Sequence, residues 1–308
     1  MDKKQRLLEL LNTLFDRNGI EAKGPELMFY CPFCDHHKRK LQVNCDTQQW
    51  HCWVCDAKGR SIFVLAKKLK APKQIYSELG DVLGLKQTYN TSDRLKTIER
   101  LPKQFQFLLD TSDGIMRNQA LKYLESRGIS KYDIIRYNIG FCVDGEYGGR
   151  IIVPSYDADG NLNYFVGRSI YEGKMKYKNP PVSKNIIVFE SNVNWSLPII
   201  LCEGVFDAIA IKRNAIPLLG KTVSEMLMSR LVSERVRDVV IALDPDALST
   251  AVSISQRLMR YGIKVRNTNL ENGDPSDLGY KTMLTKIDEA QPLDSYSLIL
   301  QKIASGSI

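Results

Sequence analysis

Four cysteines in two Cys-x-x-Cys pairs have the spacing of a metal site. Cys31 and Cys34 form the first pair, and Cys52 and Cys55 form the second, with residues 35–51 between them. Each pair lets two thiolates reach one ion, and two pairs complete a tetrahedral site. The spacing is typical of a zinc ribbon, in which a small antiparallel sheet separates the pairs. We therefore expect one structural zinc ion. Four free buried thiols are the less favoured alternative.

Carboxylates that follow apolar runs are a second set of residues suited to chemistry. The run 199–202 (IILC) is followed by Glu203. The run 238–243 (DVVIAL) is followed by Asp244, the first acid of an Asp-x-Asp motif that ends at Asp246. A buried carboxylate is costly unless it is paired or holds a cation. Each run must therefore end at a surface where negative charge is useful.

The elements expected around these acids would bring them together. Strands alternate with helices from residue 198 onward, which indicates a parallel sheet. Side chains at the carboxyl ends of parallel strands line one crevice. Oxygen ligands suit Mg²⁺ or Mn²⁺, so we expect one or two such ions there. The expected ligands are Glu203, Asp207, Asp244, Asp246 and Asp274. The alternative is that each acid is a solvated residue at a helix N-terminus.

Aromatic and basic residues are mixed around the cysteine pairs. The aromatic residues are Phe29, Tyr30, Phe33, Trp50 and Trp53, and the basic ones are Lys38, Arg39, Lys40, Lys58 and Arg60. This mixture suits single-stranded nucleic acid, which binds through base stacking and phosphate contacts. The alternative is that the aromatic rings pack the small core of the ribbon. Trp53, between two expected ligands, is the ring expected to be most exposed.

Composition agrees with an intracellular, nucleic-acid-binding protein. The 308 residues carry a net charge of +8, and the seven cysteines do not form a disulfide framework. The N-terminal residues 1–18 read as an amphipathic helix with no signal core, and no apolar run is long enough to span a membrane. We therefore expect a cytoplasmic location.

The two acidic motifs resemble those of the Toprim domain of primases, topoisomerases and some nucleases. In that family a Glu follows the first strand and an Asp-x-Asp follows a later one. The resemblance implies that Glu203 is the catalytic acid or base and that Asp244 and Asp246 bind the catalytic metal. Asp207 and Asp274 match supporting acids of the primase branch.

Three other segments resemble bacterial and phage DNA primases, in that family's order. YCPFC…WHCWVCDAKGRSIF resembles the zinc-binding domain, and ALKYLESRGIS…YNIGF resembles the start of the RNA polymerase domain. The third segment resembles the basic stretch of the RNA polymerase domain and reads GRIIVPSYDADGNLNYFVGRSIYEGKMKYKNPP. The resemblance implies that Arg150, Arg168, Lys176 and Lys184 bind nucleotide or template, with Arg127 a weaker case. A solvated basic face is the alternative.

Departures from the bacterial replicative enzyme narrow the expected branch. Cys34 stands where that enzyme usually has His, and some phage primases use four cysteines. Little sequence follows the Toprim-like region, and Gly220-Lys221-Thr222 lacks the upstream glycine of a phosphate-binding loop. The resemblance is therefore greatest to a stand-alone phage primase with a separate replicative helicase as its partner.

These observations predict a multi-domain protein that combines α+β and α/β parts. The expected parts are a zinc-binding domain with a four-cysteine ribbon (1–80), a linker (81–110), an N-terminal subdomain of an RNA polymerase core (111–197), a Toprim subdomain with a parallel sheet (198–280) and a C-terminal tail (281–308).

The expected function is that of a DNA primase, which makes short RNA primers on single-stranded DNA from ribonucleoside triphosphates. Two divalent ions would assist nucleotidyl transfer. Two alternatives share some of the same residues. One is a Toprim nuclease or topoisomerase-like strand cutter, and the other is a non-catalytic protein that binds single-stranded DNA.

Overall fold

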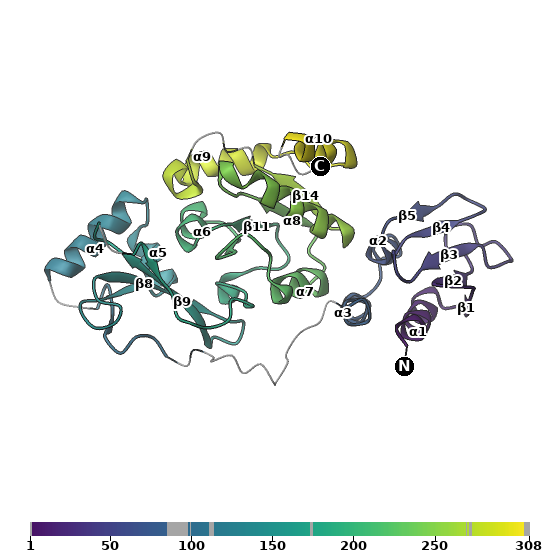
Figure 1. Ribbon diagram of the computed structural model, residues 1–308, viewed down its shortest axis with the longest axis horizontal. Helices are drawn as coiled ribbons and strands as arrows, with labels where there is room; N and C mark the ends of the chain where they lie inside the picture. Colours follow the sequence, from purple (N-terminus) through teal and green to yellow (C-terminus); the bar gives the residue numbers. More distant parts are fainter. Residues whose placement is uncertain are drawn as a thin grey trace. The chain divides into compact units, whose positions relative to one another are not determined.

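The structure is a computed structural model that describes residues 2–84, 98, 100–110, 114–172, 175–268, 270 and 273–304. The chain divides into two compact units. The first contains the described residues of Met1–Tyr89, Glu225–Asp238 and Ser253–Val265, and the second those of Asn90–Ser224, Val239–Val252 and Arg266–Ile308. Figure 1 labels the elements of both units.

An antiparallel sheet of five short strands lies in the first unit, with the strands in chain order. They are β1 (Ile20–Glu21), β2 (Glu26–Phe29), β3 (Leu41–Asn44), β4 (Trp50–Cys52) and β5 (Lys58–Gly59). The register places Leu27 opposite Val43 and Phe29 opposite Leu41. All four side chains are fully buried, so alternate residues of β2 and β3 form the apolar face of the sheet. This is the small antiparallel sheet expected between the cysteine pairs.

Helices cover the apolar side chains of this unit. They are α1 (Lys3–Phe15), α2 (Ile62–Lys68), α3 (Lys73–Val82) and α7 (Glu225–Ser233). Ser61 is the N-cap of helix α2, because its hydroxyl accepts a hydrogen bond from the Phe63 backbone N–H at 3.2 Å. Helix α3 packs against both α1 and α7.

A second antiparallel sheet, in the order β10-β9-β8-β7-β6, belongs to the second unit. Its strands are β6 (Phe105–Phe107), β7 (Gly140–Cys142), β8 (Arg150–Tyr156), β9 (Leu162–Ser169) and β10 (Tyr177–Lys178). Strands β8 and β9 form a hairpin. Asp157 shapes its turn, because the Oδ1 atom accepts hydrogen bonds from the N–H groups of Asp159 and Asn161. Helices α4 (Ile115–Ser126) and α5 (Lys131–Arg136) lie between β6 and β7 in the chain.

A four-stranded sheet in the order β12-β11-β13-β14 carries the carboxylates. Figure 1 labels its strands β11 and β14. Its strands are β11 (Ile199–Cys202), β12 (Ala215–Pro217), β13 (Asp238–Ile241) and β14 (Lys264–Asn267). The helices that follow these strands are α6 (Val205–Ile211), α8 (Leu248–Arg260), α9 (Pro275–Glu289) and α10 (Ser295–Ala304). Strand β11 pairs in parallel with both β12 and β13, which confirms the parallel sheet expected from the strand–helix alternation.

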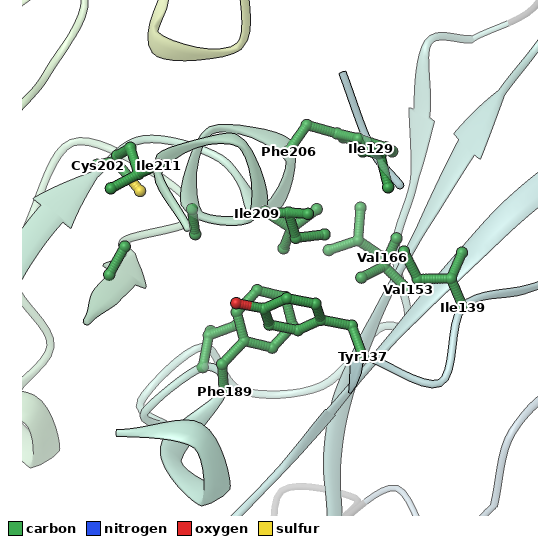
Figure 2. Close-up of a cluster of buried hydrophobic side chains, with 14 of the residues drawn as sticks. Ile129, Tyr137, Ile139, Val153, Val166, Phe189, Cys202, Phe206, Ile209 and Ile211 are labelled. Carbon is green, nitrogen blue, oxygen red and sulfur yellow. The ribbon is translucent and has the colours of Figure 1, made fainter. Parts of the chain in front are cut away.

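The core of the second unit joins the antiparallel sheet to helix α6. Figure 2 shows Tyr137 and Phe189 beneath Ile209, with Val153 of β8 beside them. The Tyr137 and Phe189 ring centroids are 4.7 Å apart. Every residue of α6 is buried, so the helix that follows Glu203 is held on all sides. This packing gives the turn at the end of β11 a rigid support.

The compact units do not follow the expected domain boundaries. Helix α7 groups with the first unit, although it lies within the expected Toprim range 198–280. The expected linker 81–110 contains the end of α3 and the whole of β6, and its residues 85–97 and 99 lie outside the described part.

The expected C-terminal tail, 281–308, is mainly helical where it is described. It contains the second half of α9 and all of α10. None of the helices in the described part of the chain is long and apolar enough to cross a membrane.

Candidate active site and zinc centre

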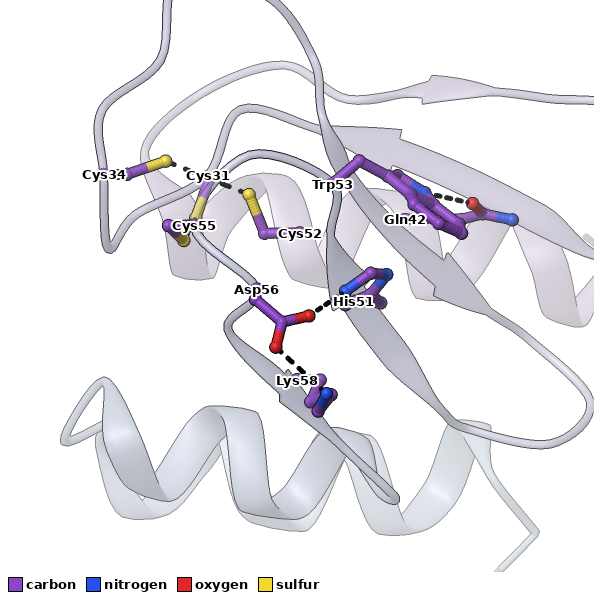
Figure 3. Close-up of polar contacts among 9 residues, drawn as sticks. All are labelled: Cys31, Cys34, Gln42, His51, Cys52, Trp53, Cys55, Asp56 and Lys58. Atoms are coloured by element: carbon purple, nitrogen blue, oxygen red, sulfur yellow. Dashed lines mark hydrogen bonds and ion pairs between the residues drawn. The ribbon is translucent and has the colours of Figure 1, made fainter.

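The four cysteines converge at one edge of the first sheet. Figure 3 shows Cys31 and Cys34 beyond β2 facing Cys52 and Cys55 at the end of β4. Their four Sγ atoms all lie within 4.8 Å of one another. Sγ of Cys31 is 3.7 Å from Sγ of Cys55, and Sγ of Cys34 is 3.9 Å from Sγ of Cys52. Four convergent sulfur ligands fit a tetrahedral zinc ion.

The environment of the thiols favours a thiolate at Cys52. Burial opposes ionisation, but the backbone N–H groups of Cys55 and Val54 outweigh it and lower the pKa of Cys52 to about 7. Burial raises the pKa of Cys31 to about 12 in the metal-free protein. A bound zinc ion would reverse this effect, because a coordinating thiol is deprotonated by the metal charge.

The aromatic residues near the zinc centre divide into core and surface groups. Phe29 and Trp50 are buried in the sheet core, whereas Phe33 and Trp53 are exposed. Trp53 is the most exposed of the four at 63%, as expected. Its indole N–H donates to Oε1 of Gln42 at 2.7 Å, which holds the ring against β3 (Figure 3).

Polar groups beside Trp53 form a linked set. The His51 Nε2 atom is 2.8 Å from Oδ1 of Asp56, and the other Asp56 oxygen pairs with the Lys58 ammonium at 3.0 Å (Figure 3). His51, Trp53 and Lys58 line one pocket of about 710 Å³ on the sheet surface. This surface combines an exposed ring with polar and basic groups, which suits stacking and phosphate contacts.

Three of the expected metal-binding carboxylates converge at the carboxyl ends of β11 and β13. One oxygen each from Glu203, Asp244 and Asp246 lies within 4.8 Å of the others. The Asp244 backbone N–H donates to Oε1 of Glu203 at 3.4 Å, which links the two strand exits. The Asp244 Oδ1 atom is buried without a hydrogen-bond partner in the described part of the chain. An uncompensated carboxylate oxygen of this kind fits a divalent cation.

Asp207 lies beside this group on the first turn of α6. It is only 7% exposed, and its Oδ2 atom accepts a hydrogen bond from the Gly204 backbone N–H at 2.9 Å. Burial, followed by the charge of Asp274, raises the pKa of Asp207 to about 7. Burial and the charge of Glu203 raise the pKa of Asp244 to about 6. These carboxyls repel one another, so a bound cation would stabilise the ionised cluster.

Asp274 has a capping role at the edge of the same pocket. Its Oδ1 atom accepts hydrogen bonds from the Asp277 backbone N–H at 2.8 Å and from the Ser276 hydroxyl at 2.7 Å, at the start of α9. The Arg127 guanidinium donates to the same Ser276 hydroxyl at 2.8 Å. Asp274 is thus fixed in position, but it is not one of the three acids whose carboxylate oxygens lie within ligand distance of one another.

Basic groups and acids line the same pocket, which has a volume of about 340 Å³. Its lining contains Arg168, Lys176, Arg127, Tyr177 and Asn179 together with Glu203, Asp207, Asp244 and Asp274. Arg168 is 8% exposed, and its Nε atom has no hydrogen-bond partner in the described residues. Its guanidinium carbon lies 4.8 Å from the Tyr177 ring centroid and 5.7 Å from that of Tyr123. A buried guanidinium with an open donor is suited to a phosphate group.

Two of the expected basic residues have other contacts. Arg150 is 5% exposed and donates to the Met175 carbonyl at 2.8 Å, so its guanidinium ties β8 to the segment before β10. Lys184 donates to the Leu219 carbonyl at 3.0 Å. Neither residue lines the pocket, and of the pair only Lys184 is exposed.

Tyr177, Asn179 and Ser276 are pocket residues that the sequence analysis did not single out. Tyr177 and Asn179 fall inside the basic stretch, between and beside lysines, and could have been found from that position. The Asn179 Oδ1 atom is buried and without a partner in the described part of the chain. Carboxylates and cationic groups that line the same pocket suit a phosphate ester with bound metal ions.

Comparisons with known proteins give a consistent relationship, although no protein-family model matches the chain. The DNA primase of Thermotoga maritima is 24% identical over 293 residues, covering 78% of this chain and 51% of the relative. The DNA primase of Helicobacter pylori is 21% identical over 366 residues, covering 99% of this chain and 64% of the relative. The chain thus spans between about half and two thirds of the length of these relatives.

Solved structures share the fold. The zinc-binding and RNA polymerase domains of the Aquifex aeolicus primase align with 100% of this chain and 90% of that one, at a TM-score of 0.54 and 18% identity. A DnaG primase catalytic domain bound to single-stranded DNA aligns with 65% of this chain and 78% of that one, at a TM-score of 0.54 and 20% identity. By sequence, the chain is therefore similar to bacterial DNA primases, and it shares the fold of the zinc-binding and RNA polymerase domains of the Aquifex aeolicus primase.

Proposed function

We propose that this protein is a DNA primase, a nucleotidyltransferase that makes short RNA primers on a single-stranded DNA template. The observation that carries the proposal is the composition of one pocket. The Glu203, Asp244 and Asp246 carboxylates gather within ligand distance, and Arg168 and Lys176 line the same pocket as Glu203 and Asp244. The relatives are DNA primases, and this arrangement suits a ribonucleoside triphosphate with divalent metal ions.

The residues have distinct roles in the proposed reaction. Glu203, Asp244 and Asp246 would hold one or two Mg²⁺ or Mn²⁺ ions, with Asp207 and Asp274 as supporting acids. The bound ions would supply charge neutralisation at the phosphates and ease ionisation of the attacking 3′-hydroxyl. Arg168 and Lys176 would hold the triphosphate of the incoming nucleotide. Glu203 would also accept the proton of the 3′-hydroxyl as the α-phosphate is attacked and pyrophosphate leaves.

The first unit has a separate role in this proposal. The four thiolates would bind one structural zinc ion, and the surface around Trp53 would engage the template strand. Zinc would contribute to folding, because a sheet of such short strands has a small core.

The proposal also includes a particular similarity to stand-alone phage primases. It is supported by the four-cysteine set, and it implies a separate replicative helicase as partner and a location in bacterial cytoplasm.

De novo synthesis on single-stranded DNA tests the proposal. Purified protein is incubated with a template of mixed sequence, Mg²⁺ and labelled ribonucleoside triphosphates, alongside Glu203→Gln. Asp159→Asn is the matched control, because Asp159 is an exposed acid in the β8–β9 turn. We expect short RNA from the wild type and the control only.

Two results would contradict the assignment. If Glu203→Gln still made RNA, the assignment of the acidic cluster as the active site would be wrong. If the protein nicked the template and made no RNA, the proposed function would instead be that of a Toprim nuclease. The reaction is repeated with replicative helicase added, so that a need for the partner is separated from a lack of activity.

A further inference from the structure

A second pocket lies in the first unit and shares no lining residue with the acidic pocket. Its volume is about 260 Å³. Four cationic side chains line it, from the end of α2 and from the segment that follows α7. They are Lys67, Lys70, Arg235 and Arg237, and the lining also includes Tyr76 and Tyr261.

Two of the four cations are held in place by neighbouring groups. The Lys67 ammonium donates to the Gly262 carbonyl at 2.9 Å. The Arg235 guanidinium carbon lies 5.0 Å from the ring centroid of Tyr76, which is itself buried. Arg235 follows the last turn of α7 with φ of 56°, a left-handed conformation that residues other than glycine adopt only when packing supports it. These two positive charges are therefore presented to the pocket without reorganisation.

The other two cations are available for a ligand. Lys70 and Arg237 are exposed, and neither side chain forms a hydrogen bond or ion pair in the described part of the chain. Lys70 also has a left-handed backbone, with φ of 54°, directly after α2. Both residues line the same pocket as the two fixed cations.

The described lining of the pocket contains no carboxylate to balance this charge. The acids nearest in sequence, Glu234 and Asp238, are not among the lining residues. Glu234 forms ion pairs with Lys73 and Arg230 instead. Burial, and then the positive charge of Arg237, lowers the pKa of Lys67, which shows that the like charges oppose one another.

We propose that this pocket binds the phosphate group of a nucleotide or of a nucleic-acid strand. Phosphate is the anion that fits a cluster of arginine and lysine, because arginine donates in pairs and lysine acts as a point charge. The volume is below the range of about 300–1,000 Å³ that is usual for whole drug-sized ligands. The pocket therefore accommodates one or two phosphate groups, while the rest of the ligand extends into solvent. This site goes beyond the proposed function and does not depend on it.

Hydrogen–deuterium exchange of the full chain locates the binding. Inorganic pyrophosphate is the first probe and single-stranded oligothymidylate the second, both without added Mg²⁺. The variant is Lys70→Gln with Arg237→Gln, and the control is Lys122→Gln with Lys131→Gln, which removes two exposed lysines of the second unit. Thermal melting is used first to check that all proteins are folded, which we expect because each substitution is at an exposed position.

We expect slower exchange over 65–76 and 231–237 in the wild type and the control, with no such change in the variant. Affinity for the same probe, measured by titration calorimetry, falls by about tenfold or more in the variant, as two lost charge-assisted contacts imply. Protection by pyrophosphate identifies nucleotide phosphates as the source, and protection by the oligonucleotide alone identifies a strand backbone. Absence of protection with both probes, or equal protection in the variant, overturns the proposal.

Discussion

The Asp207 carboxylate accepts a hydrogen bond at 2.9 Å from the backbone N–H of Gly204, the residue next to Glu203. This bond ties the first turn of α6 to the end of β11. Asp207 is only 7% exposed, on a helix whose residues are all buried. A buried acid thus fixes the turn that carries the proposed catalytic glutamate, and the two roles of Asp207 can be separated by experiment.

Replacing Asp207 with Asn should stabilise the metal-free protein at alkaline pH. Burial and the charge of Asp274 raise the pKa of Asp207 from its ordinary value of 3.8 to about 7. The native state therefore binds this proton more tightly than the unfolded state does. The stability that the bound proton gives the native state is complete below about pH 4, and it is lost as the pH rises through about 7. Asn keeps an acceptor for the Gly204 N–H and carries no charge.

Thermal melting of the wild type and Asp207→Asn, with Asp159→Asn as the exposed control, measures this effect. We expect the difference in Tm to be largest at about pH 8 and to shrink at about pH 4. Added Mg²⁺ should raise the Tm of the wild type more than that of Asp207→Asn. A difference in Tm that is the same at both pH values would show that the charge of Asp207 is not the cause.

Arg168→Lys should weaken nucleotide binding although it conserves charge. The Arg168 guanidinium lies over the Tyr177 ring and is buried with an unpartnered Nε. A lysine ammonium cannot reproduce the planar stacking or the paired donors. We expect the KM for ribonucleoside triphosphate to rise by about tenfold, equivalent to one charge-assisted contact.

The matched control is Lys178→Ala, on the same strand as Tyr177. Lys178 pairs with Glu146 at 3.2 Å and does not line the acidic pocket, so its loss should leave KM within about twofold. Steady-state primer synthesis measures both variants. If Arg168→Lys changed kcat and left KM unaltered, the triphosphate would not be bound at this guanidinium in the ground state.

Local sequence patterns predict the parallel-sheet region well. Strand β11 covers the expected run 199–202, and β13 (238–241) lies within the apolar run 238–243. Each apolar run is bounded there by an acid, a proline or a glycine, so its limits are visible in the sequence. The convergence of Glu203 and Asp244 follows from the rule that parallel strands share one carboxyl edge.

Long-range packing accounts for what the sequence patterns missed. Strand β6 has only three residues, too few for a recognisable period, and it is defined by pairing with β7. The grouping of α7 with the first unit depends on its contacts with α3, which is remote in the chain. Arg150 has the residue type for phosphate binding, but it donates one guanidinium hydrogen bond to the Met175 carbonyl and does not line the acidic pocket. No pattern within the sequence records such a contact.

Cys52→Ser should remove zinc and unfold the sheet of the first unit. Cys52 has a lowered pKa of about 7 and faces the three other thiols, so its loss breaks the ligand set. We expect zinc content, measured by atomic absorption, to fall from one ion per chain to near zero. The β1–β5 segment should then become sensitive to proteolysis.

Cys45→Ala is the control for zinc loss. Cys45 is buried in the same unit and is not part of the four-thiol group. Its replacement should cost about 1–2 kcal/mol through lost packing and leave the zinc content unchanged. Full zinc content in Cys52→Ser would exclude the four-cysteine site, whereas zinc loss in Cys45→Ala would extend it.

Lys212→Met should destabilise the second unit by removing the partner of a buried acid. Lys212 lies at the C-terminal end of α6, and its ammonium is 2.8 Å from Oδ2 of Asp133 in α5. The Asp133 side chain is 5% exposed. Burial opposes its ionisation, but hydrogen bonds from Lys212 and Ser130 outweigh burial and hold the pKa of Asp133 below its usual range. We expect a loss of about 1–3 kcal/mol at neutral pH, because the carboxylate stays buried without its cation.

The pH dependence distinguishes this ion pair from simple packing. A depressed pKa contributes stability above the unfolded-state value of 3.8, and that stability is lost as the pH falls through the native-state value. The difference between Lys212→Met and the wild type, measured by urea unfolding, should therefore shrink on acidification below about pH 4. Lys131→Met, an exposed change on α5, is the control and should be nearly neutral. A destabilisation that persists unchanged at acid pH would mean that the lysine methylenes, and not its charge, support the junction between α5 and α6.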